Sequence, residues 1–304
     1  MPPRTRLKIG WSSGYTEAYW GDWFAATQLG GSERIVVEVA CAQAAAGHEV
    51  SVRLPYAQQG EVSRRGVRWI GLDAPSEQYD VLFCADDHAR RDRGGQTILV
   101  CNRSDPPPTT DFDALCFLSQ HHARFAGHAG SPSVGGGVDL ADYLEEVPRL
   151  PNRVICTSSP DRCPRARQIG KGFDFQHAYK PVQGFQTTLY ERSGLIHLQQ
   201  SAQVLIYPLE PSRPSDFFSM AVLESMAAGT PVVVSDADSQ PEMWSESAIV
   251  LPNPVRLSEW NMAVEELLVN RELWHKFQSL GRMRAADLTW TRQAERYLAV
   301  ALEA

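Results

Sequence analysis

The stretch from Tyr207 to Trp244 constrains the fold of this chain more than any other part. A short apolar run leads through a polar loop into a short helical segment, and a Gly-Thr-Pro turn then leads into a run of valines and an acidic loop. A strand, a helix and a second buried strand in this order are typical of α/β domains. The sequence therefore predicts a largely parallel sheet here.

Two carboxylates flank the start of the helix predicted in this stretch. Asp216 and Glu224 lie eight positions apart (224 − 216). A helix N-terminus gathers unpaired N–H groups and partial positive charge, so it can hold a phosphate. A carboxylate inside the helix can accept hydrogen bonds from both hydroxyls of a vicinal diol. Phosphate and diol together describe a nucleotide sugar.

The second half of the stretch, Glu224-Ser-Met-Ala-Ala-Gly-Thr-Pro-Val-Val-Val, resembles the donor-binding signature of retaining GT-B glycosyltransferases, especially the family-four (glycosyl transferases group 1) enzymes. In the first half, Asp216 and Phe217 stand where that signature usually has Glu and Gly. The resemblance implies an α/β fold with two Rossmann-like domains facing across a cleft. It also implies sugar transfer from a nucleoside diphosphate sugar to an acceptor hydroxyl, with retention at the anomeric carbon.

The 304 residues are enough for two domains of ordinary size. We expect an N-terminal acceptor-side domain over 1–148, a donor domain over 149–286, and a C-terminal helix over 287–304 that crosses back to the first domain. Only about thirty residues, 160–188, separate two landmarks that are further apart in the family. The second domain is therefore predicted to be shortened by at least one βα unit.

Apolar runs and helical spacing predict the individual elements. In the first domain they predict a helix over 32–46 and strands over 7–11, 48–54, 67–70, 80–84, 97–101 and 114–118. In the second domain they predict strands over 154–157, 204–207, 231–235 and 248–251, and helices over 258–284 and 293–302.

The resemblance assigns roles to residues of the second domain. It implies that Glu224 binds the ribose hydroxyls, that Asp216 contacts the donor sugar, and that backbone N–H groups of Phe218, Ser219 and Met220 hold the diphosphate. Asp216 has an alternative role as the helix cap, because Asp is a good N-cap residue.

Two cations follow the first strand of the second domain. Arg162 and Lys171 resemble the Arg and Lys that neutralise the diphosphate leaving group in the family, where a cation stabilises developing charge. The alternative for each is a solvent-exposed loop charge.

In the first domain, Gly30 and Gly31 open the helix and resemble the family's Gly-Gly-x-Glu-Arg motif, which implies a phosphate or acceptor-side role. A tight turn with Ser32 as the cap is the alternative. Many relatives carry a catalytic His after a central strand. Here Asn102 or Arg103 takes that place, and His88 is the other candidate.

No metal or other cofactor is expected beyond the nucleotide sugar, for which UDP or GDP is the expected nucleotide. Adjacent His121 and His122 point apart and have no carboxylate cluster near them in the sequence. The six cysteines lie far apart, which indicates a reducing compartment and no structural zinc.

The formal net charge of −7 argues against a nucleic-acid partner. A local basic face remains an alternative and would suit a glycosyltransferase acting on modified bases in DNA; its arginines are Arg64, Arg65, Arg68, Arg90, Arg91 and Arg93. A non-catalytic nucleotide-sugar binder and an epimerase or phosphorylase of the same fold are further alternatives.

The chain shows no signal-peptide pattern and no apolar stretch of about 18 residues. We therefore expect a cytoplasmic protein without an integral membrane segment. The acceptor and the oligomeric state have no signal in the sequence.

Overall fold

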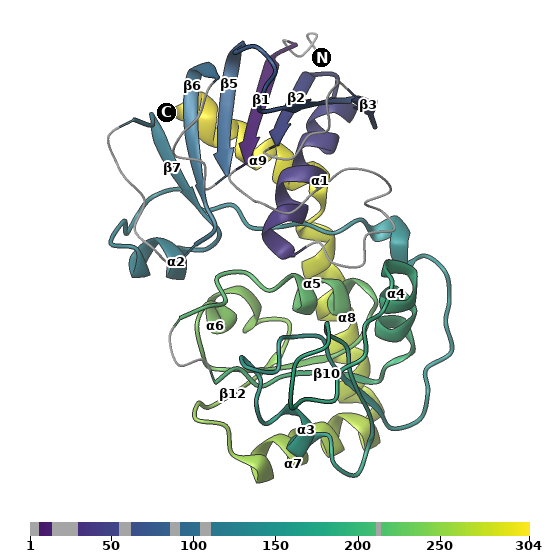
Figure 1. The fold of residues 1–304 in the computed structure, drawn as a ribbon. Helices are drawn as coiled ribbons and strands as arrows, with labels where there is room; N and C mark the ends of the chain where they lie inside the picture. The colour runs from purple at the N-terminus through teal and green to yellow at the C-terminus, as the bar shows by residue number, and fades with distance from the viewer. Residues whose placement is uncertain (1–5, 14–29, 55–61, 86–91, 104–110, 211–213) are drawn as a thin grey trace. The chain divides into compact units, whose positions relative to one another are not determined.

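The computed structural model describes residues 6–13, 30–54, 62–85, 92–103, 111–210 and 214–304 (Figure 1). The described residues divide into two compact units. One unit holds the chain up to residue 136 together with residues 290–304, and the other holds residues 137–289. Each unit is an α/β structure built on its own sheet, which is wholly parallel in the second unit and mainly parallel in the first.

The first sheet has the strand order β3-β4-β2-β1-β5-β6-β7. Its strands are β1 (Lys8–Ser13), β2 (Glu49–Leu54), β3 (Val62–Arg64), β4 (Val67–Gly71), β5 (Gln78–Ala85), β6 (Arg93–Cys101) and β7 (Ala114–Phe117). All neighbours pair in parallel except β3 and β4, which form an antiparallel pair. Without β3, this is the strand order of a Rossmann sheet, 3-2-1-4-5-6, as predicted.

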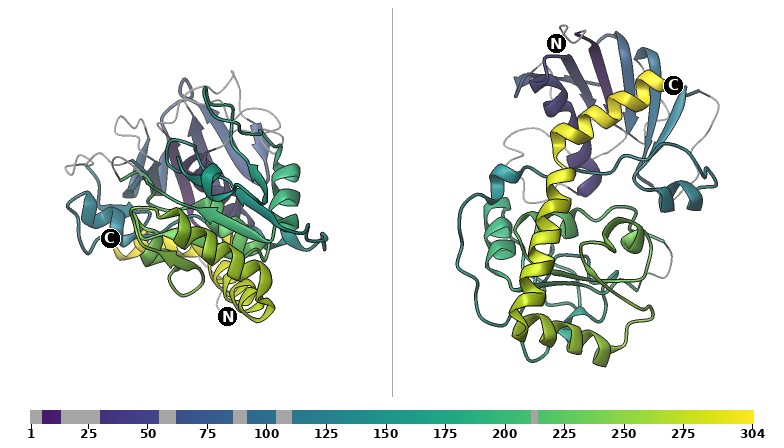
Figure 2. Two further views of the ribbon diagram at one scale, coloured as in Figure 1. Left: turned by 90° about the horizontal axis from the view of Figure 1, so that it is seen from below. Right: turned by 180° about the vertical axis from the view of Figure 1, so that it is seen from behind.

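Two long helices cover one face of the first sheet. Helix α1 (Gly31–Ala45) packs along β1, β2 and β4, helix α9 (Trp290–Glu303) packs against β6 and β7, and the two helices contact each other. Figure 2 shows α9 crossing this face in the view from behind. Tyr297 of α9 is fully buried beside the stacked rings of Trp11 and Phe83, and its hydroxyl donates to the Val134 carbonyl at 2.8 Å.

The second sheet has five parallel strands in the order β12-β11-β10-β8-β9. They are β8 (Arg153–Cys156), β9 (Asp174–His177), β10 (Val204–Tyr207), β11 (Val232–Ser235) and β12 (Ile249–Leu251). Numbered along the chain, the order is that of the five-stranded 2-1-3-4-5 sheet. The strand that would lie outside β9 in a six-stranded Rossmann sheet is missing among the described residues, which agrees with the predicted shortening.

The helical segments of the second unit connect and cover these strands (Figure 1). They are the 3₁₀ turn η1 (Leu140–Tyr143) and helices α3 (Ala166–Ile169), α4 (Arg192–Ser201), α5 (Met220–Ala227), α6 (Gln240–Trp244), α7 (Leu257–Val269) and α8 (Arg271–Asp287). The single helix predicted over 258–284 is wrong. Asn270 has extended backbone angles and separates α7 from α8, where its side chain caps the second helix.

Candidate functional site

The chain reverses its direction across the second sheet between β8 and β10. From β8 it moves outward to β9, and it then returns to form β10 on the other side of β8. Ligands of open α/β sheets bind outside the carboxyl ends of the strands at such a switch point. The two loops that leave this edge are tied together, because the Glu210 N–H donates to the Arg162 carbonyl at 2.9 Å.

Arg162 and Asp216 lie in these two loops, near enough for their charges to interact. Asp216 is buried and its carboxylate accepts a hydrogen bond from the Tyr207 hydroxyl at the end of β10. Burial raises the pKa of Asp216, while Tyr207 and the positive charge of Arg162 act to lower it. Burial lowers the pKa of Arg162, but nearby Tyr207, Asp216, Tyr179 and Asp161 together more than offset this, and the pKa is raised. The edge therefore places a cation in the electrostatic field of a buried carboxyl group.

The loop after β11 fixes the backbone around Asp216. Asp238 Oδ2 accepts from the N–H groups of Ser215 and Asp216, at 3.1 and 3.0 Å. Ser239 Oγ donates to the Asp216 carbonyl at 3.0 Å. Asp238 itself has a positive φ of 50°, a conformation that Asp tolerates better than most residues. Asp216 is thus held from both its main chain and its side chain.

Helix α5 begins at this edge of the sheet. Its N-cap is Ser219, whose hydroxyl accepts from the Val222 N–H at 3.4 Å, so Asp216 does not cap the helix. The side chains of Phe218 and Met220 are buried, and Phe218 packs edge-to-face on Trp244 with ring centroids 5.6 Å apart. The structure therefore uses these two side chains for packing. Only their backbone groups suit the predicted contact with a diphosphate.

Glu224 lies on α5 one turn beyond the cap and faces α4. It is 4% exposed, and both of its carboxylate oxygens accept hydrogen bonds. Arg192 Nη1 donates to Oε1 at 2.8 Å, and Gln199 Nε2 donates to Oε2 at 3.3 Å. Neither partner was predicted from the sequence, because nothing in a sequence marks a pairing between residues 32 and 25 positions apart on different helices.

Several buried polar groups at the same edge have no hydrogen-bond partner in the described structure. They are Thr157 Oγ1 after β8, Ser215 Oγ before Asp216, Ser235 Oγ at the end of β11, and both amide atoms of Gln240 at the start of α6. Leaving a buried polar group unpaired costs about 1–3 kcal/mol, so such groups are rare without a ligand or water. Their position suits a polar ligand at the carboxyl edge.

The structure does not bring Lys171 to this edge, contrary to the prediction. Helix α3 is a single turn, and the chain then runs back to the start of β9. Because β8 and β9 are parallel, residues just before β9 lie at the amino edge of the sheet. Lys171 is exposed there, which agrees with its alternative role as a loop charge.

The first unit carries its candidates at the carboxyl edge of its own sheet. Helix α1 follows β1, with Gly30 at the N-cap and Gly31 as the first helical residue, so Ser32 is not the cap. Asn102 and Arg103 follow β6, which is separated from β1 by β5. Asn102 is half-buried and Arg103 is exposed. His88 lies outside the described residues.

His122 is a packing residue. It is fully buried, its Nε2–H donates to the Arg103 carbonyl at 2.8 Å, and its Nδ1 accepts from the Leu118 N–H at 3.4 Å. Burial lowers the pKa of this imidazole to about 4. Within the described ranges, no group of three His, Cys, Asp or Glu residues is arranged to hold a metal ion. Those ranges also contain no helix long and apolar enough to cross a membrane.

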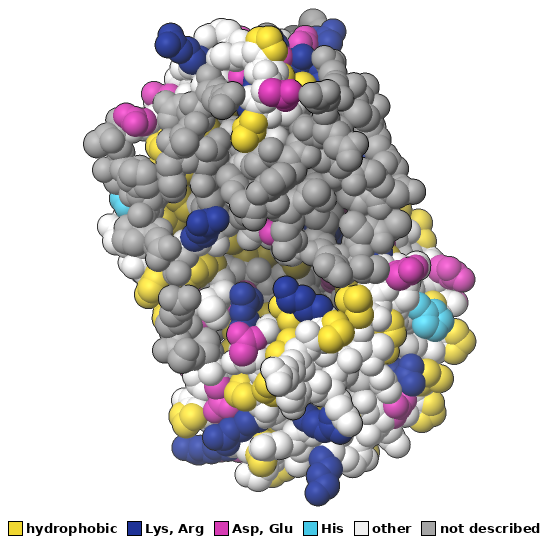
Figure 3. Space-filling model, in the orientation of Figure 1, with side chains coloured by type: hydrophobic (Ala, Val, Ile, Leu, Met, Phe, Trp, Pro, Cys, Tyr) yellow, Lys and Arg dark blue, Asp and Glu magenta, His cyan; other side chains and the backbone are white. Residues whose placement is uncertain are grey.

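The basic cluster considered for nucleic acid is partly neutralised within the first unit. Arg65 pairs with Glu38 at 2.9 Å, and Arg68 pairs with Glu77. Arg93 is exposed, whereas Arg90, Arg91 and the side chain of Arg64 lie outside the described part of the chain. In Figure 3, both acidic and basic side chains are spread over the described face of the second unit. These observations do not favour a broad phosphate-binding face.

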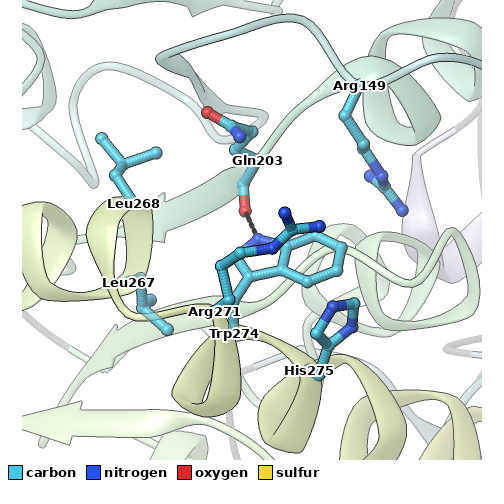
Figure 4. Close-up of a pocket in the computed structure, with 7 residues that line it drawn as sticks. All are labelled: Arg149, Gln203, Leu267, Leu268, Arg271, Trp274 and His275. Carbon is cyan, nitrogen blue, oxygen red and sulfur yellow. Dashed lines mark hydrogen bonds between the residues drawn. The ribbon is translucent and has the colours of Figure 1, made fainter.

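A pocket of about 370 Å³ lies elsewhere on the second unit, beside the start of β10 (Figure 4). It is lined by Arg149, Gln203, Leu267, Leu268, Arg271, Trp274 and His275. Arg149 donates to the carbonyls of Ala202 and Ala228, each at 2.6 Å, at the C-terminal ends of α4 and α5. A cation is favourable at helix C-termini, so this guanidinium has a structural role. The pocket is at the amino edge, away from Arg162 and Asp216.

Comparison with known proteins relates the second unit to a family model. Residues 141–270, most of the second unit, match the family model described as Glycosyl transferases group 1. Among curated proteins, none matches this sequence. The match and the fold together support a glycosyltransferase of the group 1 type, and they confirm the resemblance seen in the sequence.

Solved structures share the fold over nearly the whole chain. A glycosyltransferase involved in avilamycin A biosynthesis has a TM-score of 0.72 at 16% identity, covering 98% of this chain and 97% of its own. Sucrose-phosphate synthase from Thermosynechococcus elongatus has a TM-score of 0.70 at 12% identity, covering 97% and 98%. HepE of Anabaena, in complex with UDP and glucose, has a TM-score of 0.68 at 10% identity, covering 98% and 100%. The fold of this chain is therefore that of the GT-B glycosyltransferases.

Proposed function

We propose that this protein transfers a sugar from a nucleoside diphosphate sugar to an acceptor hydroxyl, with retention at the anomeric carbon. The observation that carries the proposal is the switch point of the second sheet, where the loop that holds buried Asp216 is hydrogen-bonded to the loop of Arg162 and where α5 begins. The family match over this unit supports the reaction class. The UDP bound to the Anabaena structure favours a UDP-sugar over a GDP-sugar as the donor.

Each group at the edge has a role that suits its chemistry. The Arg162 guanidinium stabilises the charge that develops on the departing diphosphate. The backbone N–H groups at the start of α5, around Phe218, Ser219 and Met220, receive the phosphates. Glu224 accepts hydrogen bonds from the ribose hydroxyls, and Asp216 accepts a hydrogen bond from a hydroxyl of the donor sugar. Lys171 has no part in this proposal, because it lies at the other edge of the sheet.

The first unit is proposed to serve the acceptor. Its candidate groups are the N-terminus of α1 at Gly30 and Gly31, together with Asn102 and Arg103 after β6. None of these groups is a strong base. Catalysis would therefore depend on positioning and on charge stabilisation in the second unit.

We propose that the reaction needs no bound metal ion, since Arg162 and the helix N-terminus supply positive charge for the diphosphate. Dialysis against a chelator is then expected to leave the rate of nucleotide release unchanged. A rate that falls with the chelator and returns with added Mg²⁺ or Mn²⁺ would contradict this part of the proposal.

A turnover assay tests the proposed reaction. Purified protein is incubated with UDP- and GDP-sugars, with water or a panel of hydroxyl compounds as acceptor, and released nucleoside diphosphate is measured. We expect Asp216→Asn and Arg162→Gln each to lower the rate about 100-fold or more, the scale seen when a charge-stabilising group is removed. Arg153→Gln is the matched control, because Arg153 pairs with Asp174 at the amino edge.

The other functions considered give different results in the same assay. Nucleotide binding without any release would indicate a non-catalytic binder. Conversion of the donor sugar into its epimer, without release of the nucleotide, would indicate an epimerase. NMR of a transfer product reports its anomeric configuration directly, and an inverted product would contradict the proposed retention.

A further inference from the structure

Glu224 and three other side chains of the second unit form a closed ring of hydrogen bonds. Arg192 donates to Oε1 and Gln199 to Oε2, at 2.8 and 3.3 Å. The Tyr143 hydroxyl donates to Gln199 Oε1 at 3.3 Å. Arg192 Nη2 closes the ring by donating to the Tyr143 oxygen at 3.4 Å. The members come from η1, α4 and α5.

The ring restricts the orientation of Glu224. Gln199 is fully buried, and the Glu224 side chain is 5% exposed. A second carboxylate holds the guanidinium in place, since Asp142 Oδ2 accepts from Arg192 Nη2 at 2.9 Å. Because both carboxylate oxygens are bound by groups that are themselves held, rotation of the carboxylate would break at least two hydrogen bonds.

Stability alone does not account for this arrangement. Buried ion pairs can often be replaced by apolar residues of similar size with little loss of stability, because desolvation cancels much of the attraction. A carboxylate oxygen can accept more than one hydrogen bond. A carboxylate fixed in this way suits a ligand with two adjacent hydroxyls.

We propose that Arg192, Gln199 and Tyr143 are positioning residues. They orient the Glu224 carboxylate so that it accepts hydrogen bonds from both hydroxyls of a ribose. This inference rests on the proposed function, because it takes the ribose to be that of the donor nucleotide. Arg192 acts through Glu224 and has no contact with the reacting atoms. The ring should therefore govern how well the protein distinguishes a ribonucleotide from its 2′-deoxy counterpart.

The test compares UDP with 2′-deoxy-UDP by calorimetric titration of the whole protein. The wild type is expected to bind UDP more tightly, because only UDP presents both hydroxyls to Glu224. Arg192→Met should reduce this preference about tenfold, since hydrogen bonds to charged groups are the stronger ones. The affinity for 2′-deoxy-UDP should change much less. Arg153→Met, which breaks an ion pair at the opposite edge, should leave the preference unchanged.

Tyr143→Phe is the second variant, and it tests the same preference for UDP if Arg192→Met does not fold. It removes only the hydroxyl that closes the ring, so we expect a smaller but measurable fall in the preference for UDP. A preference that stays at the wild-type value in both folded variants would overturn the inference and leave the proposed function standing. Equal wild-type binding of UDP and 2′-deoxy-UDP would also overturn it.

Failure of the proposed function looks different. In that case the wild type would bind none of UDP, GDP and ADP, and no preference could be measured. If GDP or ADP binds in place of UDP, the same comparison is made with that nucleotide and its 2′-deoxy form, and the expected changes are the same.

Discussion

Asp216 shows how one residue combines a departure from the family motif with a specific environment. The family usually has Glu at this position, and the shorter Asp here is held by the Tyr207 hydroxyl and by Asp238 through its backbone. Tyr207 is 3% exposed, so its hydroxyl has little access to water. Asp216 is therefore a rigid acceptor whose geometry depends on Tyr207.

Replacing Tyr207 with Phe should show this dependence. The change removes one donor to a buried carboxylate, so the free energy of unfolding should fall by about 1.5–3 kcal/mol. Urea denaturation of both proteins at neutral pH measures the difference. Tyr190→Phe is a control of the same chemistry at a half-exposed position, and no loss is expected there. An unchanged midpoint in Tyr207→Phe would mean that the hydroxyl does not hold Asp216.

His122 provides a pH-dependent prediction. Its pKa is about 4 in the folded protein and about 6.5 when unfolded. Between these values the unfolded chain binds the extra proton, so stability should fall as pH drops from about 6.5 to about 4. The shift corresponds to roughly 3 kcal/mol at the acid end.

Unfolding free energies measured across this pH range should therefore fall less steeply in His122→Gln than in the wild type. His275→Gln alters an exposed imidazole and should keep the wild-type slope. Identical slopes for all three proteins would contradict the assigned role of His122.

At the residue scale, the sequence identified groups that belong to one contiguous motif, and it could not identify their partners. Glu224 and the start of α5 follow from local spacing, which a helix preserves. The pairing of Glu224 with Arg192 depends on how two helices pack, and no local pattern encodes it. Lys171 lies at the amino edge because the chain turns back into β9 soon after α3, and no local pattern in the sequence marks that turn.

Among the elements, the break between α7 and α8 is the clearest departure from the predicted pattern. The apolar spacing continues across Asn270, so periodicity alone indicates one helix. Asn270 Oδ1 accepts from the Leu273 N–H at 3.1 Å, and its Nδ2 donates to Glu266 Oε1 at 2.7 Å. Asn is among the best N-cap residues, and its side chain replaces the helical hydrogen bonds lost at the break.

Asn270→Ala should therefore lower the free energy of unfolding by about 1 kcal/mol, the usual cost of losing an N-cap. Asn270→Asp keeps the acceptor and should lose much less. Thermal or urea unfolding of the two variants against the wild type measures the difference. Equal losses in both variants would show that the cap at α8 contributes nothing.

Strand prediction succeeded where strands are apolar and failed where they are polar. β5 and β6 of the first sheet and β10 and β11 of the second each contain a run of buried, mostly apolar residues, which is typical of buried parallel strands. β9 has the sequence Asp-Phe-Gln-His, with only His177 buried, and β3 has three residues. Such edge strands form through pairing with a neighbour, so a single sequence gives little sign of them.

At the scale of the whole molecule, the prediction of two units built on mainly parallel sheets, with a smaller sheet in the second, was correct. The strand orders differ, with a Rossmann order in the first unit and a five-stranded order in the second. Solved structures only 10–16% identical to this chain share its fold, which shows how few of its residues are needed to specify it. The sequence gives no comparable indication of the acceptor. Binding residues are often on loops, whose sequences can differ between proteins that share the same sheets.

The central claim is that the carboxyl edge of the second sheet binds a nucleoside diphosphate through Glu224. The most direct test is a thermal-shift measurement of the wild type and Glu224→Gln with UDP, GDP, ADP, CMP and dTDP. Glu272→Gln, at an exposed position on α8, is the control. A ligand at 100 times its dissociation constant adds about 2.7 kcal/mol of stability, which shifts the melting temperature measurably. We predict that one diphosphate, with UDP favoured, raises the melting temperature of the wild type and the control clearly more than that of Glu224→Gln. No shift with any nucleotide, or the same shift in Glu224→Gln, would contradict the claim.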